Sequence, residues 1–197
     1  MAAEMTGIVL AGGRSTRMGR DKATLPWGTS DLLHTVLARL APVSDQLIVV
    51  SNKPRKIAQP GVEVISDRTP GCGPLAGIYA GLSASRLAYS FVAACDMPFL
   101  NTGAVAYIRS AAQGYDAAVP LIGGYYNPLH AVYHRNCLPF IERLLAAKNY
   151  QVLAFYPAIN LRPVSAGELT VFDPGLLTLS NVNTPGDFCR LTGKTDY

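Results

Sequence analysis

The sequence predicts an α/β protein, a single domain built on a doubly wound, mostly parallel sheet that is flanked by helices. Short apolar segments alternate along the chain with segments of helical periodicity, which is the pattern of βαβ units. The 197 residues are 49% hydrophobic and 15% charged, which suits a compact protein with a buried sheet and excludes a disordered chain. This length fits one domain, and no repeat or linker divides residues 1–197.

The predicted strands are short, apolar and rich in β-branched residues, as buried strands of a parallel sheet are. They cover residues 6–11, 46–51, 62–67, 89–96, 116–121 and 129–134. After residue 150 the pattern loosens, and two further short segments, LRPVS and LTVFD, have β-like composition.

The predicted helices lie between these strands, over residues 31–41, 73–85, 102–113 and 137–148. The first of them places aliphatic residues on one face: Leu33, Val36, Leu37 and Leu40. The second has Pro74 in its first turn, and its small residues would let it pack closely on a sheet. A last helix is predicted to begin at residues 183–185, where the sequence reads NTP.

The net charge of +4 is too mild to indicate a nucleic-acid-binding protein. The 4 cysteines are spread along the chain without a C-x-x-C pair, so a zinc site is not expected and reduced thiols are. The N-terminus lacks the pattern of a signal peptide, and no apolar run is long enough for a membrane helix. We therefore expect a cytoplasmic protein that binds neither nucleic acid nor membrane.

The first predicted strand is followed by LAGGRSTRMGRDK, residues 10–22, which matches neither G-x-G-x-x-G nor the P-loop pattern. Gly12 and Gly13 would still let backbone N–H groups approach a ligand closely, and Arg17 and Lys22 would add mobile cations. Together they indicate a binding loop for a polyanion such as a triphosphate, in preference to a βα turn with solvated arginines. A second basic cluster, Lys53 to Lys56, is interpreted as a solvated surface.

Two aspartates follow predicted strands. Asp96 ends the most apolar segment of the chain, where a charge is costly unless it is compensated, and Mg²⁺ would compensate it. A helix cap for the segment near Thr102 is the weaker interpretation. Asp67 is a metal ligand, a nucleoside-binding acid or merely a turn residue, and the sequence does not decide between these.

No Ser-His-Asp or Cys-His arrangement can be placed in the sequence. His34 and His134 are expected to be structural, His130 is a candidate for the wall of the site, and Cys95 is assigned to the core. The missing nucleophile favours a reaction in which one substrate attacks the other. In nucleotidyl transfer a phosphate attacks a nucleoside triphosphate, and catalysis consists of alignment and charge neutralisation.

The motif of residues 10–22 resembles the L-A-G-G-x-x-x-R-M-G-x-D-K signature of MobA-like nucleotidyltransferases. GPLAGI at 73–78, ACDMPFL at 94–100, PLHAVY at 128–133 and NVNTP at 181–185 match the same family in the same order. The resemblance thus covers nearly the whole chain, and it implies a Rossmann-like nucleotidyltransferase fold. It also implies Mg²⁺-dependent transfer of GMP from GTP to molybdopterin, the molybdenum cofactor, with release of pyrophosphate.

The resemblance also implies roles for particular residues. Arg17 and Lys22 would neutralise the triphosphate, and Asp96 would hold Mg²⁺; these form the expected catalytic set. The expected nucleotide-binding residues are Leu10, Ala11, Gly12, Gly13, Lys22, Ser51 or Asn52, Asp67 and Asp96. The expected residues on the acceptor side are Pro74, Leu75, His130, Asn181 and Asn183.

Many members of the family carry an arginine near the start of the strand that follows the long helix. Here the nearest cation is Lys148, which leaves the identity of the acceptor substrate open. We expect the acceptor pocket to lie across the sheet from residues 10–22, the loop that would bind GTP. It would lie near residues 127–130, 148–151 and 181–183. The expected partners are GTP, molybdopterin and, transiently, the proteins that donate the cofactor or receive it. Alternatives are cytidylyl transfer to the same acceptor, a small sugar-1-phosphate nucleotidyltransferase, and a nucleotide-binding cofactor chaperone without turnover.

Overall fold

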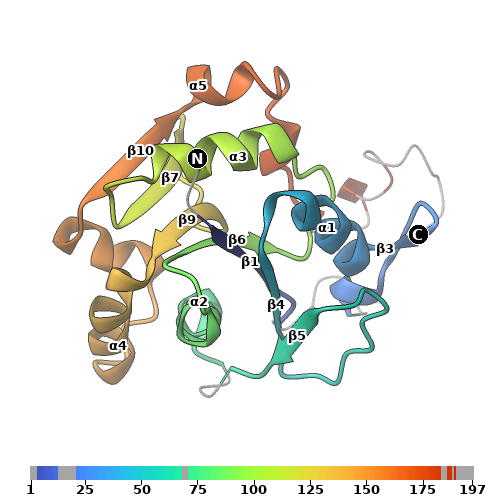
Figure 1. Cartoon of the computed structure of the whole chain (residues 1–197), viewed down its shortest axis with the longest axis horizontal. Helices are drawn as coiled ribbons and strands as arrows, with labels where there is room; N and C mark the ends of the chain where they lie inside the picture. The colour runs from blue at the N-terminus through green and yellow to red at the C-terminus, as the bar shows by residue number, and fades with distance from the viewer. Residues whose placement is uncertain (1–3, 13–20, 68–70, 183–185, 188, 190–197) are drawn as a thin grey trace.

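A mixed eight-stranded sheet runs through the protein, with helices on both faces (Figure 1). The structure, a computed structural model, describes residues 4–12, 21–67, 71–182, 186–187 and 189. The strand order is β10 (Leu161–Ser165), β7 (Ala117–Ile122), β9 (His130–His134), β6 (Tyr89–Ala94), β1 (Met5–Leu10), β4 (Gln46–Val50) and β5 (Val62–Ile65). Beside this path β8 (Tyr125–Tyr126) pairs with β7, and β2 (Pro26–Trp27) with β3 (Ser30–Asp31) forms a separate hairpin.

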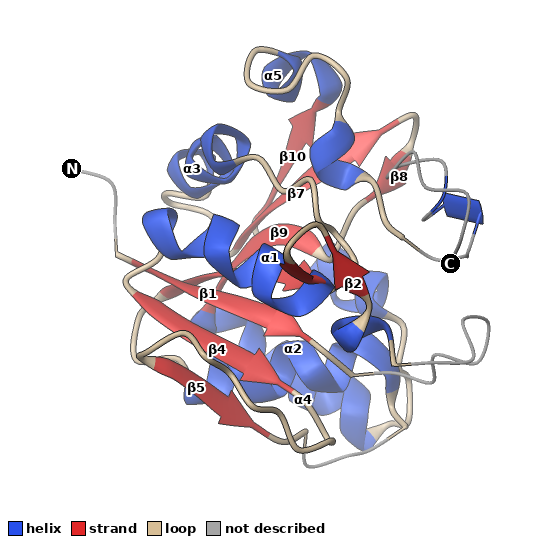
Figure 2. Ribbon diagram, turned by 90° about the vertical axis from the view of Figure 1, so that its right-hand side faces the viewer, coloured by secondary structure: helices blue, strands red, loops and turns tan. Residues whose placement is uncertain are grey.

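The sheet is mostly parallel, as predicted. The neighbouring strands β6, β1, β4 and β5 all run in one direction, and the arrows of β1, β4 and β5 point the same way in Figure 2. Strand β9 runs antiparallel to both of its neighbours, β6 and β7. Every residue of β1 is buried, which explains why this central strand is apolar apart from Thr6, whose hydroxyl donates to Gln46 Oε1 at 3.0 Å.

The helices form a layer on each face of the sheet. Their bounds are α1 (Leu32–Leu40), α2 (Gly73–Ala84), α3 (Thr102–Ala111), α4 (Leu138–Ala146) and α5 (Ala166–Thr170). Helices α1 and α3 cover one face, and α2 and α4 the other (Figure 1). Because side chains alternate along a strand, Val9 of β1 packs in the core with α1 and α3, whereas Ile8 and Leu10 pack in the core with α2 and α4. Among the described residues, no helix combines the length and apolar character needed to cross a bilayer.

Two of the predicted helices follow the physical signals that the sequence gives. In α1 all the residues of the predicted apolar face are buried, and the Asp31 carboxylate accepts a hydrogen bond from His34 N at 2.8 Å, which caps the helix. Helix α2 begins with Pro74 in its first turn and lies close to β1. A Cβ added to Gly81 would lie 2.6 Å from Cγ2 of Ile8, so a larger residue there would require Ile8 or α2 to shift.

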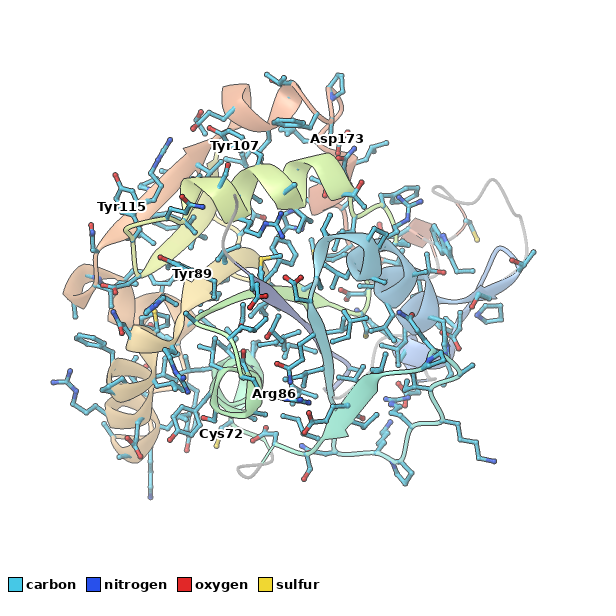
Figure 3. The ribbon with its side chains drawn as sticks, viewed as in Figure 1. Cys72, Arg86, Tyr89, Tyr107, Tyr115 and Asp173 are labelled. Carbon is cyan, nitrogen blue, oxygen red and sulfur yellow. The ribbon has the colours of Figure 1, made fainter. Side chains whose placement is uncertain are left out.

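The region after residue 150 differs in part from the prediction. LRPVS is indeed a strand, β10, but the β-like interpretation of LTVFD is wrong because helix α5 already includes Leu169 and Thr170. The physical reason is a capping box between Ser165 and Glu168, whose side chains each accept a hydrogen bond from the other residue's backbone. Figure 3 shows Tyr107 of α3 near α5, and its hydroxyl donates to Glu168 Oε1 at 2.5 Å. The helix predicted to start at 183–185 begins outside the described residues.

Candidate active site

A pocket of about 920 Å³ opens at the edge of the sheet where β1, β4, β5 and β6 end. The chain leaves β1 for β4 and β5 on one side and then returns to β6 on the other side, so the strand order reverses beside β1. Open α/β sheets bind ligands at such a point. The pocket is lined by these residues of the sequence prediction: Leu10, Ala11, Gly12, Lys22, Ser51, Asn52, Asp67, Pro74, Asp96 and Asn181.

Lys22 and Asp96 form an ion pair in this pocket. The Lys22 ammonium donates to Asp96 Oδ2 at 2.9 Å, and the two side chains are 19% and 12% exposed. Asp96 follows β6, and Lys22 opens a short 3₁₀ turn, Lys22–Thr24. The Asn181 carboxamide donates to Asp96 Oδ1 at 3.3 Å, and Val182 N donates to the Asp96 carbonyl at 2.8 Å. Asp96 is thus the point where three distant segments of the chain meet.

The fit of a divalent cation rests on the chemistry of Asp96. Within the residues that the structure describes, no cluster of three or more His, Cys, Asp or Glu side chains could hold a metal by itself. Mg²⁺ commonly takes only one or two protein carboxylates and completes its shell with water and substrate phosphates. Asp96, with the Asn181 carboxamide beside it, fits that pattern, whereas a site made of protein ligands alone does not.

The side chains of Ser51 and Asn52, which both line the pocket, differ in their exposure. The Ser51 hydroxyl donates to Lys53 O at 3.0 Å and accepts from Arg55 Nε at 3.0 Å, so its hydrogen bonds are made within the protein. The Asn52 side chain is exposed, and its Oδ1 accepts from Asp67 N at 2.9 Å, which joins the segments after β4 and β5. Of the two candidates that the sequence left open, Asn52 is therefore the one with an exposed side chain at the pocket.

The interpretation of the second basic cluster as solvated surface is wrong for Arg55. Lys56 is exposed, but the Arg55 side chain is only 5% exposed. Its Nη2 donates to the Ala11 carbonyl at 3.0 Å and lies 2.9 Å from Asp21 Oδ2. Sequence reasoning missed the contact between Arg55 and Asp21 because 34 residues separate them, and only the pairing of β1 with β4 brings them together.

Asp21 is the second residue that sequence reasoning missed. Its carboxylate lies between Arg55 and Lys53, and it accepts from Ala23 N at 3.2 Å. Burial raises the pKa of Asp21, but hydrogen bonds from Lys53 and Ala23 and the charge of Arg55 outweigh it and leave the pKa below its usual value. Asp21 is therefore a carboxylate, not an acid, at neutral pH.

Leu75 and His130 lie in the core and do not line the described wall of the pocket. Leu75 is fully buried because it stands on the sheet-facing side of α2. His130 is fully buried too, packs edge-on against Phe91 with ring centroids 5.0 Å apart, and has Nε2 3.2 Å from Thr178 Oγ1. Burial lowers the pKa of His130 to about 3, so the ring is neutral. Its neighbour Leu129 lines the pocket instead.

The remaining predictions about the site divide into three groups. Gly13, Arg17 and Asn183 lie outside the described residues. Of the segments expected around the acceptor, 127–130 and 181–183 each contribute to the pocket that also holds Lys22, whereas 148–151 contributes nothing to its described wall. Cys95 is buried, and burial raises the pKa of its thiol to about 12, which agrees with its assignment to the core.

The fold and the pocket together define a class of protein, an open α/β domain whose ligand pocket, at the reversal point of the sheet, holds a cation and a carboxylate. The chain belongs to a particular family within it, because the family model described as "MobA-like NTP transferase domain" matches residues 7–159. A "Probable molybdenum cofactor guanylyltransferase" of Pelotomaculum thermopropionicum is 37% identical over 187 residues, covering 95% of this chain and 91% of that protein. One of Methanosarcina acetivorans with the same name is 38% identical, covering 96% and 90%.

The fold is also that of a solved relative. The crystal structure of molybdopterin-guanine dinucleotide biosynthesis protein A from Archaeoglobus fulgidus superposes with a TM-score of 0.83 at 27% identity, covering 95% of this chain and 97% of that one. The predicted Rossmann-like nucleotidyltransferase fold is therefore confirmed.

Proposed function

We propose that this protein is a nucleotidyltransferase that transfers GMP from GTP to molybdopterin and releases pyrophosphate. The observation that carries the proposal is the Lys22–Asp96 pair, 2.9 Å apart at the reversal point of the sheet. The names of the relatives support the choice of guanylyl transfer and of the acceptor. Because the donor is GTP, we place the reaction in the cytoplasm.

The residues of the pocket would bind and align the two substrates. A Cβ built on Gly12 would meet no atom within 4 Å, so the backbone after β1 is open to a nucleotide on that side. Lys22 would leave Asp96 and neutralise the triphosphate, and Asp96 would then be free to bind Mg²⁺ together with phosphate oxygens. When bound, this cation supplies further charge neutralisation at the transferring phosphate. Asn52 and Asp67 would hold the nucleoside.

The transfer itself needs no protein nucleophile. An oxygen of the acceptor phosphate forms a bond to the α-phosphorus of GTP, and the bond from that phosphorus to the bridging oxygen breaks as pyrophosphate leaves. The acceptor phosphate is already ionised, so no general base is required. The buried side chains of Cys95, which precedes Asp96, and of His130, which follows Leu129, stay neutral and would take no part. On the acceptor side, Pro74, Leu129 and Asn181 line the same pocket.

Titration calorimetry with GTP, CTP, ATP and UTP in the presence of Mg²⁺ tests the donor. We expect preference for GTP, weaker binding in Lys22→Ala, and no change in Lys56→Met, which removes one charge from an exposed side chain. A transfer assay with molybdopterin tests the acceptor, and Asp96→Ala is expected to be inactive. Preference for CTP would change the reaction to cytidylyl transfer, and nucleotide binding without any turnover would favour the chaperone alternative.

A further inference from the structure

We propose that Arg55 is a positioning residue which, through Asp21, holds Lys22 in place for the triphosphate. The proposal rests on the proposed function, since it assigns Lys22 a phosphate to meet. It concerns a residue that the sequence indicated to be a surface cation.

The Arg55 guanidinium joins three segments of the chain at the edge of the sheet. Its Nη2 donates to the Ala11 carbonyl after β1, its Nε donates to the Ser51 hydroxyl after β4, and its Nη2 also pairs with Asp21. The planar, always charged guanidinium suits this task because it donates in several fixed directions at once. With 5% of the side chain exposed, the group is held within the protein and is not a solvated charge.

Asp21 connects Arg55 to the turn that contains Lys22. Its side chain caps the turn that Lys22 begins, by accepting from Ala23 N at 3.2 Å. Its carbonyl accepts from Thr24 N at 3.1 Å, and the Lys22 carbonyl accepts from Leu25 N at 3.1 Å. The turn that contains Lys22 is therefore tied through Ala23 N to a carboxylate that Arg55 holds, and the Lys22 ammonium reaches Asp96 from that turn.

Lys53 cannot replace Arg55 in this role. Its ammonium lies 3.1 Å from Asp21 Oδ2, but its side chain is 57% exposed, and an ion pair in water contributes little. The alternative is that Arg55 touches the nucleotide itself, because it also lines the pocket. Positioning and direct contact differ in one respect: a positioning residue has little effect once Lys22 is gone.

The first experiment measures the anchoring without any nucleotide. Hydrogen–deuterium exchange is followed at the amides of Ala23 and Leu25 in the native chain, in Arg55→Met and in Lys56→Met as the matched control. We expect faster exchange in Arg55→Met and an unchanged exchange rate in Lys56→Met. Arg55→Lys should show an intermediate rate, because it keeps a positive charge for Asp21 but loses the several donors of the guanidinium. Unchanged exchange in Arg55→Met overturns the proposal, and the same melting temperature in all variants shows that the fold is intact.

The second experiment is a double-mutant cycle on GTP affinity with Lys22→Ala. We expect Arg55→Met to weaken GTP about tenfold in the native background and less than about twofold in Lys22→Ala, because coupled residues are not additive. Equal losses in both backgrounds would show direct contact or an independent effect, and would overturn the positioning role. If the native chain binds no nucleotide at all, the proposed function fails, while the exchange data still decide whether Arg55 anchors the turn.

Discussion

Replacing Lys22 by methionine is expected to strengthen the binding of Mn²⁺ to the nucleotide-free protein. The change removes the ammonium but keeps an unbranched apolar side chain of similar length to the lysine stem. In the nucleotide-free pocket the ammonium lies 2.9 Å from Asp96 Oδ2, on the carboxylate that would hold the metal. A cation entering alone must therefore displace Lys22, whereas one entering with a triphosphate finds Lys22 drawn to the phosphates.

The size of the effect follows from the burial of the pair. With side chains 19% and 12% exposed, the Lys22–Asp96 pair lies between a surface ion pair, which contributes at most about 1 kcal/mol, and a fully buried one, whose disruption costs about 3 to 5 kcal/mol. We take about 1 to 2 kcal/mol as the cost of displacing Lys22. This corresponds to a gain in Mn²⁺ affinity of about 5- to 30-fold.

The assay is a Mn²⁺ titration followed by electron paramagnetic resonance, which counts free Mn²⁺ without any need for activity. Lys56→Met serves as the control for the lost charge, and Lys22→Met combined with Asp96→Asn tests whether the gain arises at Asp96. Unchanged or weaker Mn²⁺ binding in Lys22→Met would refute the reasoning, and so would a gain that survives the loss of Asp96. The same Lys22→Met protein is expected to bind GTP more weakly than the native chain.

Further predictions concern stability. Gly81→Ala places a methyl group 2.6 Å from Ile8 and should cost about 1 to 2 kcal/mol in urea unfolding, whereas Gly167→Ala, with open space around it, should be neutral or stabilising. Burial raises the pKa of Glu168, but its hydrogen bonds outweigh burial and lower the pKa from 4.5 to about 2. The ionised Glu168 therefore contributes to the free energy of unfolding above pH 4.5, and this contribution is lost as the pH falls through about 2. Glu168→Gln should therefore unfold more easily at pH 7, with a smaller difference from the native chain at pH 2. Burial lowers the pKa of His130 from 6.5 to about 3, so stability should fall as the pH drops from 6.5 towards 3, and His130→Gln should flatten that slope in pH-dependent thermal unfolding.

The fold could be predicted from the sequence because its signals are local. Apolar β-branched segments, the apolar face of α1 and the proline that opens α2 each report their own element within a few residues. The alternation of strands and helices then limits the sheet to a few arrangements. The segment LTVFD misled because composition favoured a strand, whereas the capping box of Ser165 and Glu168 starts a helix just before it.

The core positions of Leu75 and His130 could have been found from side-chain periodicity. Leu75 stands three residues before Ile78 and seven before Leu82, so the three share the sheet-facing side of α2. His130 is paired with Ala93 on β6, and in a strand its side chain must point to a face of the sheet rather than along its edge. A motif match names a segment as functional, but the period of the element decides which of its residues face the pocket.

The contacts of Arg55 cannot be predicted from local sequence signals, but they can be predicted from the topology of the sheet. Its partners Asp21 and Ala11 are 34 and 44 residues away in the sequence, so no window of residues contains the contact. Yet β1 and β4 are the strands that α1 connects, and they pair in parallel. The loops that follow two neighbouring parallel strands must leave the sheet side by side, which makes an acid in one and an arginine in the other natural partners. The same rule places Asp96 beside Lys22, because β6 is the neighbour of β1 on its other side. In a sheet of this kind, charged residues should therefore be compared between loops of adjacent strands before any of them is assigned to the solvent.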